Sequence, residues 1–306
     1  MSITCCCTLA VLFAAAAPTA AAPKFDLRAP PNADGTRSAK VEVAGVKSAL
    51  PDGATAVRAA AATCDGKYVF FVHGLGRYNL PATQLDRGWI NTAALSVFDG
   101  ATGKRINTVI LDDPMKGAAN PRGIAVNDKW IAIVHHGTHE LSLIPKKAFF
   151  EKLLAYKGDA TADLAFMREV GRKRIALPEK FPVAIKFKGE DEYEITYAKY
   201  SDGEAAFNDA SLCYQGWQSC ASCHIDGKND GLKWDFAGSG GGLGHPEETV
   251  DLSKLKSLSS TCVPNSFRDD HLYAAPSETV KVTEAYIRSI SYAKEQQAHD
   301  SKKAAR

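Results

Sequence analysis

An internal repeat in the first half of the 306-residue chain constrains its fold more than any other feature. The segment KYVFFVHG at residues 67–74 matches KWIAIVHH at 129–136, and NTAALSVFD at 91–99 matches GTHELSLIP at 137–145. Each copy contains an apolar strand, a loop and a second strand, and glycine-containing turns lead to further strands. Repeats of about 40–45 residues that consist of short strands are typical of β-propeller blades. The repeat therefore predicts a β-propeller-like domain over residues 55–202.

The copies are too few to close a propeller. A third copy is predicted to begin at Arg174, with the strands RIAL, FPVAIKF and YEITYAKYSD, after a helical interruption that contains PKKAFFEKLLAYKG and DLAFMREVG. This gives about three blades, whereas a closed propeller has at least about four. We therefore expect an incomplete propeller, the exposed sheet edges of which can pair with another chain, including a second copy of this one. A small open β-sheet without propeller ancestry is the alternative.

The character of the sequence changes at Ser201-Asp202-Gly203. Strand-like alternation stops, GEAAFNDASL indicates a short helix, and a last helix is predicted to begin near Ser277, a favourable N-cap. Residues 203–292 are thus predicted to form a small all-α domain, and the polar residues 293–306 a fraying tail. The fold class expected for the whole chain is β plus α: an incomplete β-propeller-like domain of about three blades, followed by a small helical domain.

The helical domain contains the motif Cys220-Ala-Ser-Cys223-His224. Cys-x-x-Cys-His is the attachment signature of a c-type haem: the two cysteines bind the vinyl groups as thioethers, and the histidine binds one axial face of the iron. The motif predicts one covalent haem c and makes residues 203–292 a cytochrome c domain, with Trp217 as a packing partner of the porphyrin. A vicinal redox disulfide is the alternative for the two cysteines, and an ordinary core role is the alternative for Trp217.

A haem iron has a second axial position, on the face opposite His224. A methionine of the same domain does not fill it, because no methionine follows His224 in the chain. His245 ends the glycine-rich loop GSGGGLGHPEET, and glycines allow a backbone to pass close to a flat cofactor. We therefore expect His245 to be the second axial ligand. His271 is the second candidate, an open or water-bound position is the third, and Met115 or Met167 from the β-propeller-like domain is the last.

A histidine cluster lies in the second copy of the repeat, at His135, His136 and His139. Histidine is a common metal ligand, but strands and a turn do not direct all three rings to one face. His73 occupies the position in the first copy that matches His135, which favours a structural role. We expect local hydrogen bonding, with a metal site as the alternative.

The beginning of the chain is typical of an exported protein. Residues 3–22 carry no charge and end in small residues, so residues 1–22 are predicted to be a cleaved signal peptide, with an uncleaved membrane anchor as the alternative. Residues 23–54 form an N-terminal extension. We expect a periplasmic or secreted protein, which agrees with the motif because c-type haem is attached outside the cytoplasm in bacteria.

The remaining cysteines beyond the leader are Cys64, Cys213 and Cys262. Cys213 and Cys262 flank the haem segment and could form a disulfide in an oxidising compartment, or remain two separate buried thiols. Cys64 precedes a strand and is expected in the core. The net charge is +2 and no cluster of Lys and Arg indicates a nucleic-acid partner, so that class of protein is set aside.

Two resemblances extend this interpretation. The segment FNDASLCYQGWQSCASCHIDGKNDG resembles the N-terminal haem segment of the bacterial di-haem cytochrome c peroxidases, in which a histidine from a glycine-containing loop can cap the haem; Gly244-His245 lies at a similar place. Residues 55–292 are similar to secreted bacterial proteins that join a YVTN-type β-propeller to a peroxidase-like cytochrome c domain. The chain departs from these families, because it lacks several blades, a second Cys-x-x-Cys-His and a methionine near Thr261-Cys262-Val263.

These features predict a periplasmic c-type haem protein that transfers single electrons, with the β-propeller-like domain docking a redox partner protein. Bis-histidine ligation would give a lower reduction potential than His/Met ligation. A cytochrome c peroxidase-like enzyme acting on hydrogen peroxide is an alternative, in which His245 or Glu247 moves a proton between the peroxide oxygens and a partner supplies the second haem. The other alternative is a non-catalytic, shortened paralogue that serves as an interaction module.

Overall fold

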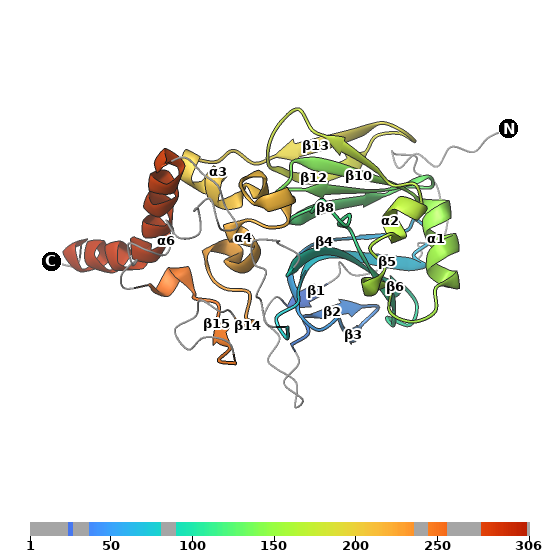
Figure 1. Ribbon diagram of the computed structural model, residues 1–306, viewed down its shortest axis with the longest axis horizontal. Helices are drawn as coiled ribbons and strands as arrows, with labels where there is room; N and C mark the ends of the chain where they lie inside the picture. Colours follow the sequence, from blue (N-terminus) through green and yellow to red (C-terminus); the bar gives the residue numbers. More distant parts are fainter. Residues whose placement is uncertain (1–23, 27–36, 81–89, 236–243, 256–276, 305–306) are drawn as a thin grey trace.

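The protein, described by a computed structural model, is a mixed β-plus-α molecule with several antiparallel sheets and few helices (Figure 1). This coarse fold class agrees with the prediction from the sequence. The structure describes residues 24–26, 37–80, 90–235, 244–255 and 277–304. Predictions that fall outside these ranges concern the signal peptide (residues 1–22), Cys262 with its proposed disulfide, and His271.

The first copy of the repeat forms a four-stranded antiparallel sheet in which the strands follow chain order. Its strands are β4 (Ala54–Ala62), β5 (Tyr68–Gly76), β6 (Asn91–Asp99) and β7 (Arg105–Ile110). β6 is buried along almost its whole length, including its polar residues Asn91, Thr92 and Ser96. Cys64 lies in the turn between β4 and β5 and is exposed, so the expectation of a core position was wrong.

The second copy forms a sheet of the same kind, with strand order β11-β10-β9-β8. Its strands are β8 (Pro121–Val126), β9 (Trp130–His135), β10 (Glu140–Pro145) and β11 (Lys173–Ala176). Arg174 pairs with Ser142 of β10, so RIAL completes the second sheet and does not open a third copy. The prediction failed because two helices separate the third strand of this sheet from the fourth.

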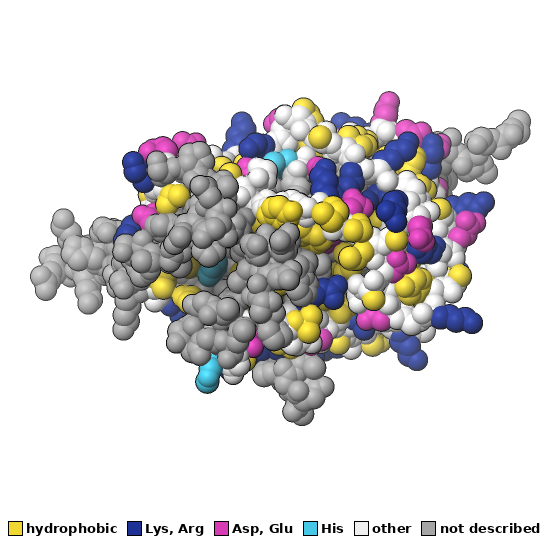
Figure 2. Space-filling model, in the orientation of Figure 1, with side chains coloured by type: hydrophobic (Ala, Val, Ile, Leu, Met, Phe, Trp, Pro, Cys, Tyr) yellow, Lys and Arg dark blue, Asp and Glu magenta, His cyan; other side chains and the backbone are white. Residues whose placement is uncertain are grey.

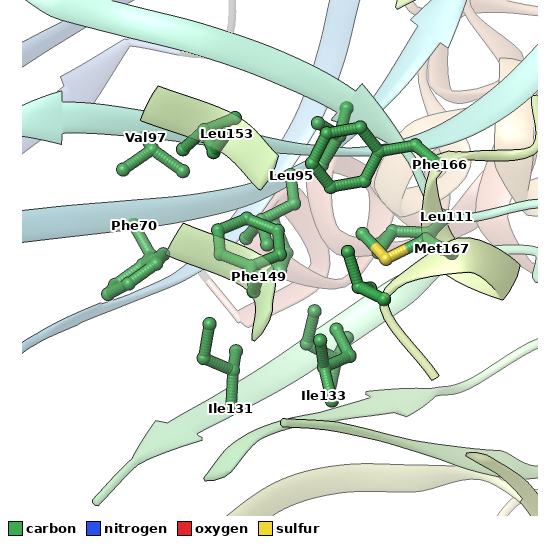
Figure 3. Packing of buried hydrophobic residues seen from close by; sticks show 14 of the residues in the cluster. Phe70, Leu95, Val97, Leu111, Ile131, Ile133, Phe149, Leu153, Phe166 and Met167 are labelled. Atoms are coloured by element: carbon green, nitrogen blue, oxygen red, sulfur yellow. The ribbon is translucent and has the colours of Figure 1, made fainter. Parts of the chain in front are cut away.

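The two inserted helices, α1 (Lys146–Ala155) and α2 (Phe166–Glu169), cover the core of both sheets. Phe149 of α1 and Phe166 of α2 are fully buried and join a cluster that contains Phe70 of the first sheet (Figure 3). Burial of one such side chain stabilises a fold by about 1.5–3 kcal/mol. The insertion is therefore part of the core of the repeat and not an appendage to it.

Matching side chains in the two sheets make the same hydrogen bond. His73 Nε2 lies 2.9 Å from Ser96 Oγ in the first sheet, and His135 Nε2 lies 2.8 Å from Ser142 Oγ in the second. The residues of these pairs occupy matching positions in the sequence repeat. The repeat is thus preserved in its buried polar contacts, where an unpaired group would cost stability.

The other strands before residue 200 form two smaller sheets. β12 (Pro182–Phe187) and β13 (Tyr193–Tyr197) form a two-stranded sheet. Both β12 and β4 pack against β8. The first strands of three successive units, β4, β8 and β12, therefore lie in a row. Strands β4 to β13 make up the β half of the molecule. The N-terminal extension contributes a three-stranded sheet of β1 (Lys24–Asp26), β2 (Lys40–Val43) and β3 (Val46–Ala49).

The C-terminal segment, residues 202–304, lies at the end of the sheets opposite to α1 and α2 (Figure 1). It is not purely helical, because Lys233 and Trp234 pair with Glu248 and Glu247 in a short antiparallel ribbon. Its elements are α3 (Asp202–Asn208), α4 (Cys220–Cys223), β14 (Lys233–Trp234), β15 (Glu247–Glu248) and α6 (Ser277–Ala304). Short 3₁₀ turns lie at Ala160–Ala162, Ala210–Leu212, Tyr214–Gly216, Ile225–Gly227 and Leu252–Lys254.

The last helix begins at Ser277 as predicted, but it continues to Ala304. The polar segment that we expected to fray is therefore helical backbone as far as Ala304. Its Ala, Lys, Glu and Gln residues are strong helix formers and extend a helix that is already nucleated. No helix among the described residues combines the length and hydropathy needed to cross a membrane.

Charged side chains of both signs cover the end of the molecule that carries α1 and α2. Figure 2 shows Lys and Arg interspersed with Asp and Glu on that end, whereas hydrophobic side chains gather nearer the middle of the same face. The described residues of this face thus form no field of one sign at that end.

Candidate functional site

The motif Cys220-Ala-Ser-Cys223-His224 folds as a single helical turn, α4, with His224 at its C-terminal end. The backbone N–H of Ser219 donates to Ser222 Oγ at 3.0 Å, which is one half of a capping box. Residues three apart lie on one face of a helix. Cys220 and Cys223 therefore present their thiols on the same face, with a histidine directly after them.

Backbone carbonyls hold the ring of His224. Its Nδ1 lies 3.2 Å from the carbonyl oxygen of Lys228 and 3.0 Å from that of Val250. A carbonyl oxygen can only accept, so Nδ1 carries the proton and Nε2 keeps a lone pair. Burial lowers the pKa of His224, which favours the neutral imidazole. The arrangement is the one that a metal-ligating histidine requires.

Burial raises the pKa of two thiols near this histidine: that of Cys223 well above its ordinary value, and that of Cys213 to about 11. Asn91 Nδ2 donates to Cys223 Sγ at 3.1 Å. Cys220 and Cys223 are not joined by a disulfide in this structure, and the vicinal redox disulfide stays an alternative role for the motif.

An apolar cluster adjoins α4. The residues buried in it include Phe207 of α3, Leu252 of the last 3₁₀ turn and Ile287 of α6. Cys220 packs against this cluster. The ring centroid of Phe207 lies 6.5 Å from that of His224. Two thiols and an imidazole therefore border apolar surface, which can cover part of a flat hydrophobic cofactor.

Trp217 is buried in a different environment, on the side of α4 that faces the β half. Its Nε1–H donates to Gln215 Oε1 at 3.2 Å. Trp234 packs with Ile90 and Leu232 against the β half. Both tryptophans thus help to seat the C-terminal segment on the sheets.

Two asparagines of the β half hold α4 by hydrogen bonds. Asn120, which precedes β8, donates from Nδ2 to Ser219 Oγ at 2.8 Å and accepts from Ser222 Oγ at 2.7 Å. Asn91, at the start of β6, donates from Nδ2 to Gln218 Oε1 at 3.0 Å. The two sheets therefore fix the position of the motif, because each supplies one of these side chains.

An ion pair adds a third link between the β half and the motif. Arg58 of β4 contacts the carboxylate of Asp226 through two nitrogens, at 3.0 and 2.9 Å. Asp226 lies two residues after His224. The paired contacts have the bidentate geometry that gives Arg–carboxylate pairs their directionality.

The histidine cluster of the second sheet is engaged in local hydrogen bonds, as predicted. His135 belongs to the repeated His–Ser pair, His136 Nε2 accepts from the hydroxyl of Tyr200 at 3.1 Å, and His139 Nε2 lies 3.1 Å from Asp209 Oδ1. Among the residues that the structure describes, no group of three or more His, Cys, Asp or Glu side chains is placed to hold a metal ion.

The expected distal ligand, His245, is exposed two residues before β15 begins, and Glu247 in β15 is exposed as well. The chain then continues to Val250, the carbonyl of which binds Nδ1 of His224. Because Nδ1 and Nε2 lie on opposite sides of an imidazole, this stretch passes the side of His224 that faces away from its lone pair. The structure describes no contact between His245 and His224.

The methionine alternatives fall into two cases. Met167 is fully buried beside Leu111 and Ile133 in the core (Figure 3), at the end of the molecule away from α4. Its thioether cannot reach His224, so that alternative is wrong. Met115 is exposed in the connection between β7 and β8. Nothing among the described residues holds its side chain toward α4.

A pocket lies between the β half and α4. Ala221 and Ser222, the two residues between the motif cysteines, line it together with residues of the first and second sheets. The nitrogen-bearing side chains that line it are Arg58, Asn91, Asn120, Arg122, His136, Asn208 and Trp217.

The two arginines of the pocket lie at β-bulges, which the sequence analysis did not anticipate. The pairing of β4 with β5 shifts register before Ala59, and that of β8 with β9 shifts before Gly123. Arg58 and Arg122 are the residues directly before these positions. Because a bulge re-aims the side chains beside it, an irregularity repeated in both sheets brings two guanidinium groups to one pocket.

A left-handed residue precedes each bulge. Ala56 has φ 49°, Asn120 has φ 55°, and Phe181 has φ 60° before the corresponding register shift at the start of β12. Asn120 and Phe181 each precede a proline, and such dipeptides mark turns and strand starts. This pattern was the available signal, although it does not reveal where the arginine side chains point.

The comparisons with known proteins give little further information. No family model matches the chain, and no curated protein matches it. One similar solved structure is the hydrazine synthase of Kuenenia stuttgartiensis, with a TM-score of 0.46 and 18% sequence identity over 55% of this chain. The match spans 54% of that structure's chain, about half its length. A likeness this distant carries no argument about function.

Proposed function

We propose that this chain carries one covalent haem c on Cys220 and Cys223, with His224 as an axial ligand, and that it transfers single electrons. The observation that carries the proposal is the state of His224. Its Nδ1–H is held by the carbonyls of Lys228 and Val250, so Nε2 retains the lone pair that an iron ligand needs.

The other side chains around α4 fit such a cofactor. The two thiols share a helix face, and Phe207, Leu252 and Ile287 supply apolar surface beside them. The haem would supply a one-electron iron couple. The protein's own residues would orient the imidazole through Val250 and hold the attachment turn against the β half.

The β half supports the proposal that it derives from a propeller. Its first strands, β4, β8 and β12, lie in a row, and each begins with a left-handed residue followed by a register shift. We propose that it contains two complete blade-like units and a third of two strands. The incomplete third unit is then the place where a second copy or a partner would pair with the sheet edge.

The setting that we propose is the periplasm or the exterior of the cell, with a redox protein as the partner. The uncharged segment at residues 3–22 and the haem motif support export together. A carrier needs a partner that gives or takes one electron, and the β half offers the larger surface for docking it.

The proposal is tested by expressing the full chain with its leader in a bacterium that attaches c-type haem. The wild type should keep its haem after denaturation, with a haemochrome spectrum for two thioether bonds and one haem per chain. Cys220→Ala with Cys223→Ala should lose the covalent haem. Cys213→Ala is the matched control, since it removes a nearby buried thiol outside the motif. Covalent haem in the double variant, or none in the wild type, would refute the proposal.

The sixth ligand is tested by the spin state of the ferric protein. We expect low-spin iron that becomes high-spin in His245→Ala and stays low-spin in His271→Ala. The reverse result would assign the ligand to His271. High-spin iron in the wild type that reacts with hydrogen peroxide would replace the carrier by the peroxidase-like alternative, in which His245 or Glu247 transfers the proton.

A further inference from the structure

The pocket between the β half and α4 holds one positive charge that no described residue balances. Arg58 is already paired with Asp226. His136 is neutral, because burial and, after it, the charge of Arg122 lower its pKa to about 3. Arg122 itself has no ion-pair or hydrogen-bond partner among the described residues. The charge of the lining, taken with Asp226, is therefore +1 at neutral pH.

Amide donors adjoin this charge. Asn120 Nδ2 donates one hydrogen to Ser219 Oγ, and Asn208 Nδ2 donates one to the carbonyl of Glu204. A side-chain amide has two hydrogens, so each group keeps one that no described residue accepts. The pocket thus combines an unpaired guanidinium with two spare N–H groups.

We propose that this pocket binds a small organic carboxylate through Arg122, with Asn120 and Asn208 as further donors. The planar guanidinium fork matches the two oxygens of a carboxylate. A single positive charge matches a single carboxylate better than a multiply charged phosphate.

This site goes beyond the proposed haem function and does not depend on it. Ala221 and Ser222, which line the pocket, lie between the two cysteines that would hold a haem, so the titration compares the chain with and without haem.

The test is calorimetric titration of the full chain with acetate, propionate and inorganic phosphate at constant ionic strength. Acetate or propionate should bind saturably. Arg122→Gln should weaken this binding about tenfold or more, because a charge-assisted hydrogen bond is lost. Arg122→Lys should bind the carboxylate with an affinity between those of the wild type and Arg122→Gln, since lysine keeps the charge but lacks the planar guanidinium fork. Arg168→Gln replaces an exposed arginine of α2 at the opposite end, and this matched control should bind like the wild type.

Several results would overturn the proposal. These are the absence of saturable carboxylate binding, saturable binding of phosphate alone, and equal weakening in Arg122→Gln and Arg168→Gln. Binding by the cofactor-free chain that vanishes when haem is attached would assign the pocket to the cofactor instead. Circular dichroism confirms the fold of each variant; if Arg122→Gln does not fold, the wild-type and Arg122→Lys titrations decide.

Discussion

In the β half, 18 buried apolar side chains from both four-stranded sheets and the inserted helices form one cluster. The described part of the C-terminal segment has its own cluster of four, namely Phe207, Cys213, Leu252 and Ile287. Each large apolar side chain contributes about 1.5–3 kcal/mol when buried. The difference indicates that the β half can fold on its own core, whereas the C-terminal segment depends on what it packs against.

The contacts between the two regions include directional polar bonds beside the apolar packing of Leu232 and Trp234 against Ile90. Asn91 and Asn120 hold α4, Arg58 pairs with Asp226, and Asp209 at the end of α3 binds the loops of the second sheet. Polar contacts of this kind specify position more than they add stability. The β half therefore acts as the template on which the motif takes its geometry.

The largest expected effect comes from the core of the β half. Phe149→Ala should lower the free energy of unfolding by about 3–5 kcal/mol, because it leaves a cavity among fully buried side chains. Denaturant titration measures this loss. Phe207→Ala is the counterpart, and it should speed hydrogen exchange in the C-terminal segment while β5 and β9 keep their protection. Equal deprotection of β5 and β9 by both variants would abolish the distinction between the regions.

The next effect is pH-dependent and concerns Asp209. Burial alone would raise its pKa, but hydrogen bonds from His139, Ser211 and Lys180 outweigh burial and hold the pKa well below its usual range. A depressed carboxylate pKa stabilises the folded state above the unfolded pKa of 3.8, and this contribution fades as the pH falls below that value.

Asp209→Asn should therefore destabilise the protein by about 1.5–3 kcal/mol at pH 7. The difference from the wild type should shrink progressively as the pH falls below about 4, since protonation of the wild-type unfolded state then removes the same contribution. Thermal melts at a series of pH values measure it. A difference that stays constant from pH 7 to pH 3 would show that the charge of Asp209 is not involved.

A smaller effect is expected at the link between β8 and α4. Asn120→Gly removes two neutral hydrogen bonds, worth about 1–2 kcal/mol together, while glycine tolerates the left-handed φ of 55°. Hydrogen exchange should rise in α4 but not in β9. Asn127→Gly is the control, because Asn127 bonds within the β8–β9 turn; if both variants loosen α4 equally, the link to Asn120 is unimportant.

The smallest effect is expected for the ion pair. Asp226→Asn should cost less than about 1 kcal/mol, since Asp226 is half exposed and surface pairs are screened by solvent. The effect should disappear in high salt. Asp191→Asn, which breaks an exposed pair with Lys129 inside the β half, is the matched comparison. A salt-independent loss at Asp226 would mean that it acts through the backbone turn rather than through Arg58.

The sequence allowed the regular parts of this fold to be predicted. The apolar strands of the repeat, the helical interruption, α3 and the start of α6 have local signals, namely periodicity and caps. β11 was misassigned because its pairing with β10 is non-local and a helical insertion separates the two strands. The burial of Met167 was missed for a similar reason, since α2 is folded back into the core by tertiary contacts.

The candidate site was predicted in part. The residues of α4 follow from a contiguous motif, but the partners that orient them, Asn91, Asn120 and Val250, lie far away in the chain. The bulges that aim Arg58 and Arg122 arise from strand register, which depends on a facing strand rather than on local sequence. Such features become visible only when the sheets are assembled.

The long separations along the chain imply an order of events during folding. Ser222 is 102 residues from Asn120, and Asp226 is 168 residues from Arg58. Contacts this distant in sequence close late, because the intervening chain must first be ordered. We expect the β half to be complete before α4 docks. The two thiols of the motif then remain accessible on the unfinished chain until α4 docks, and the covalent attachment that we propose would have to take place in that interval.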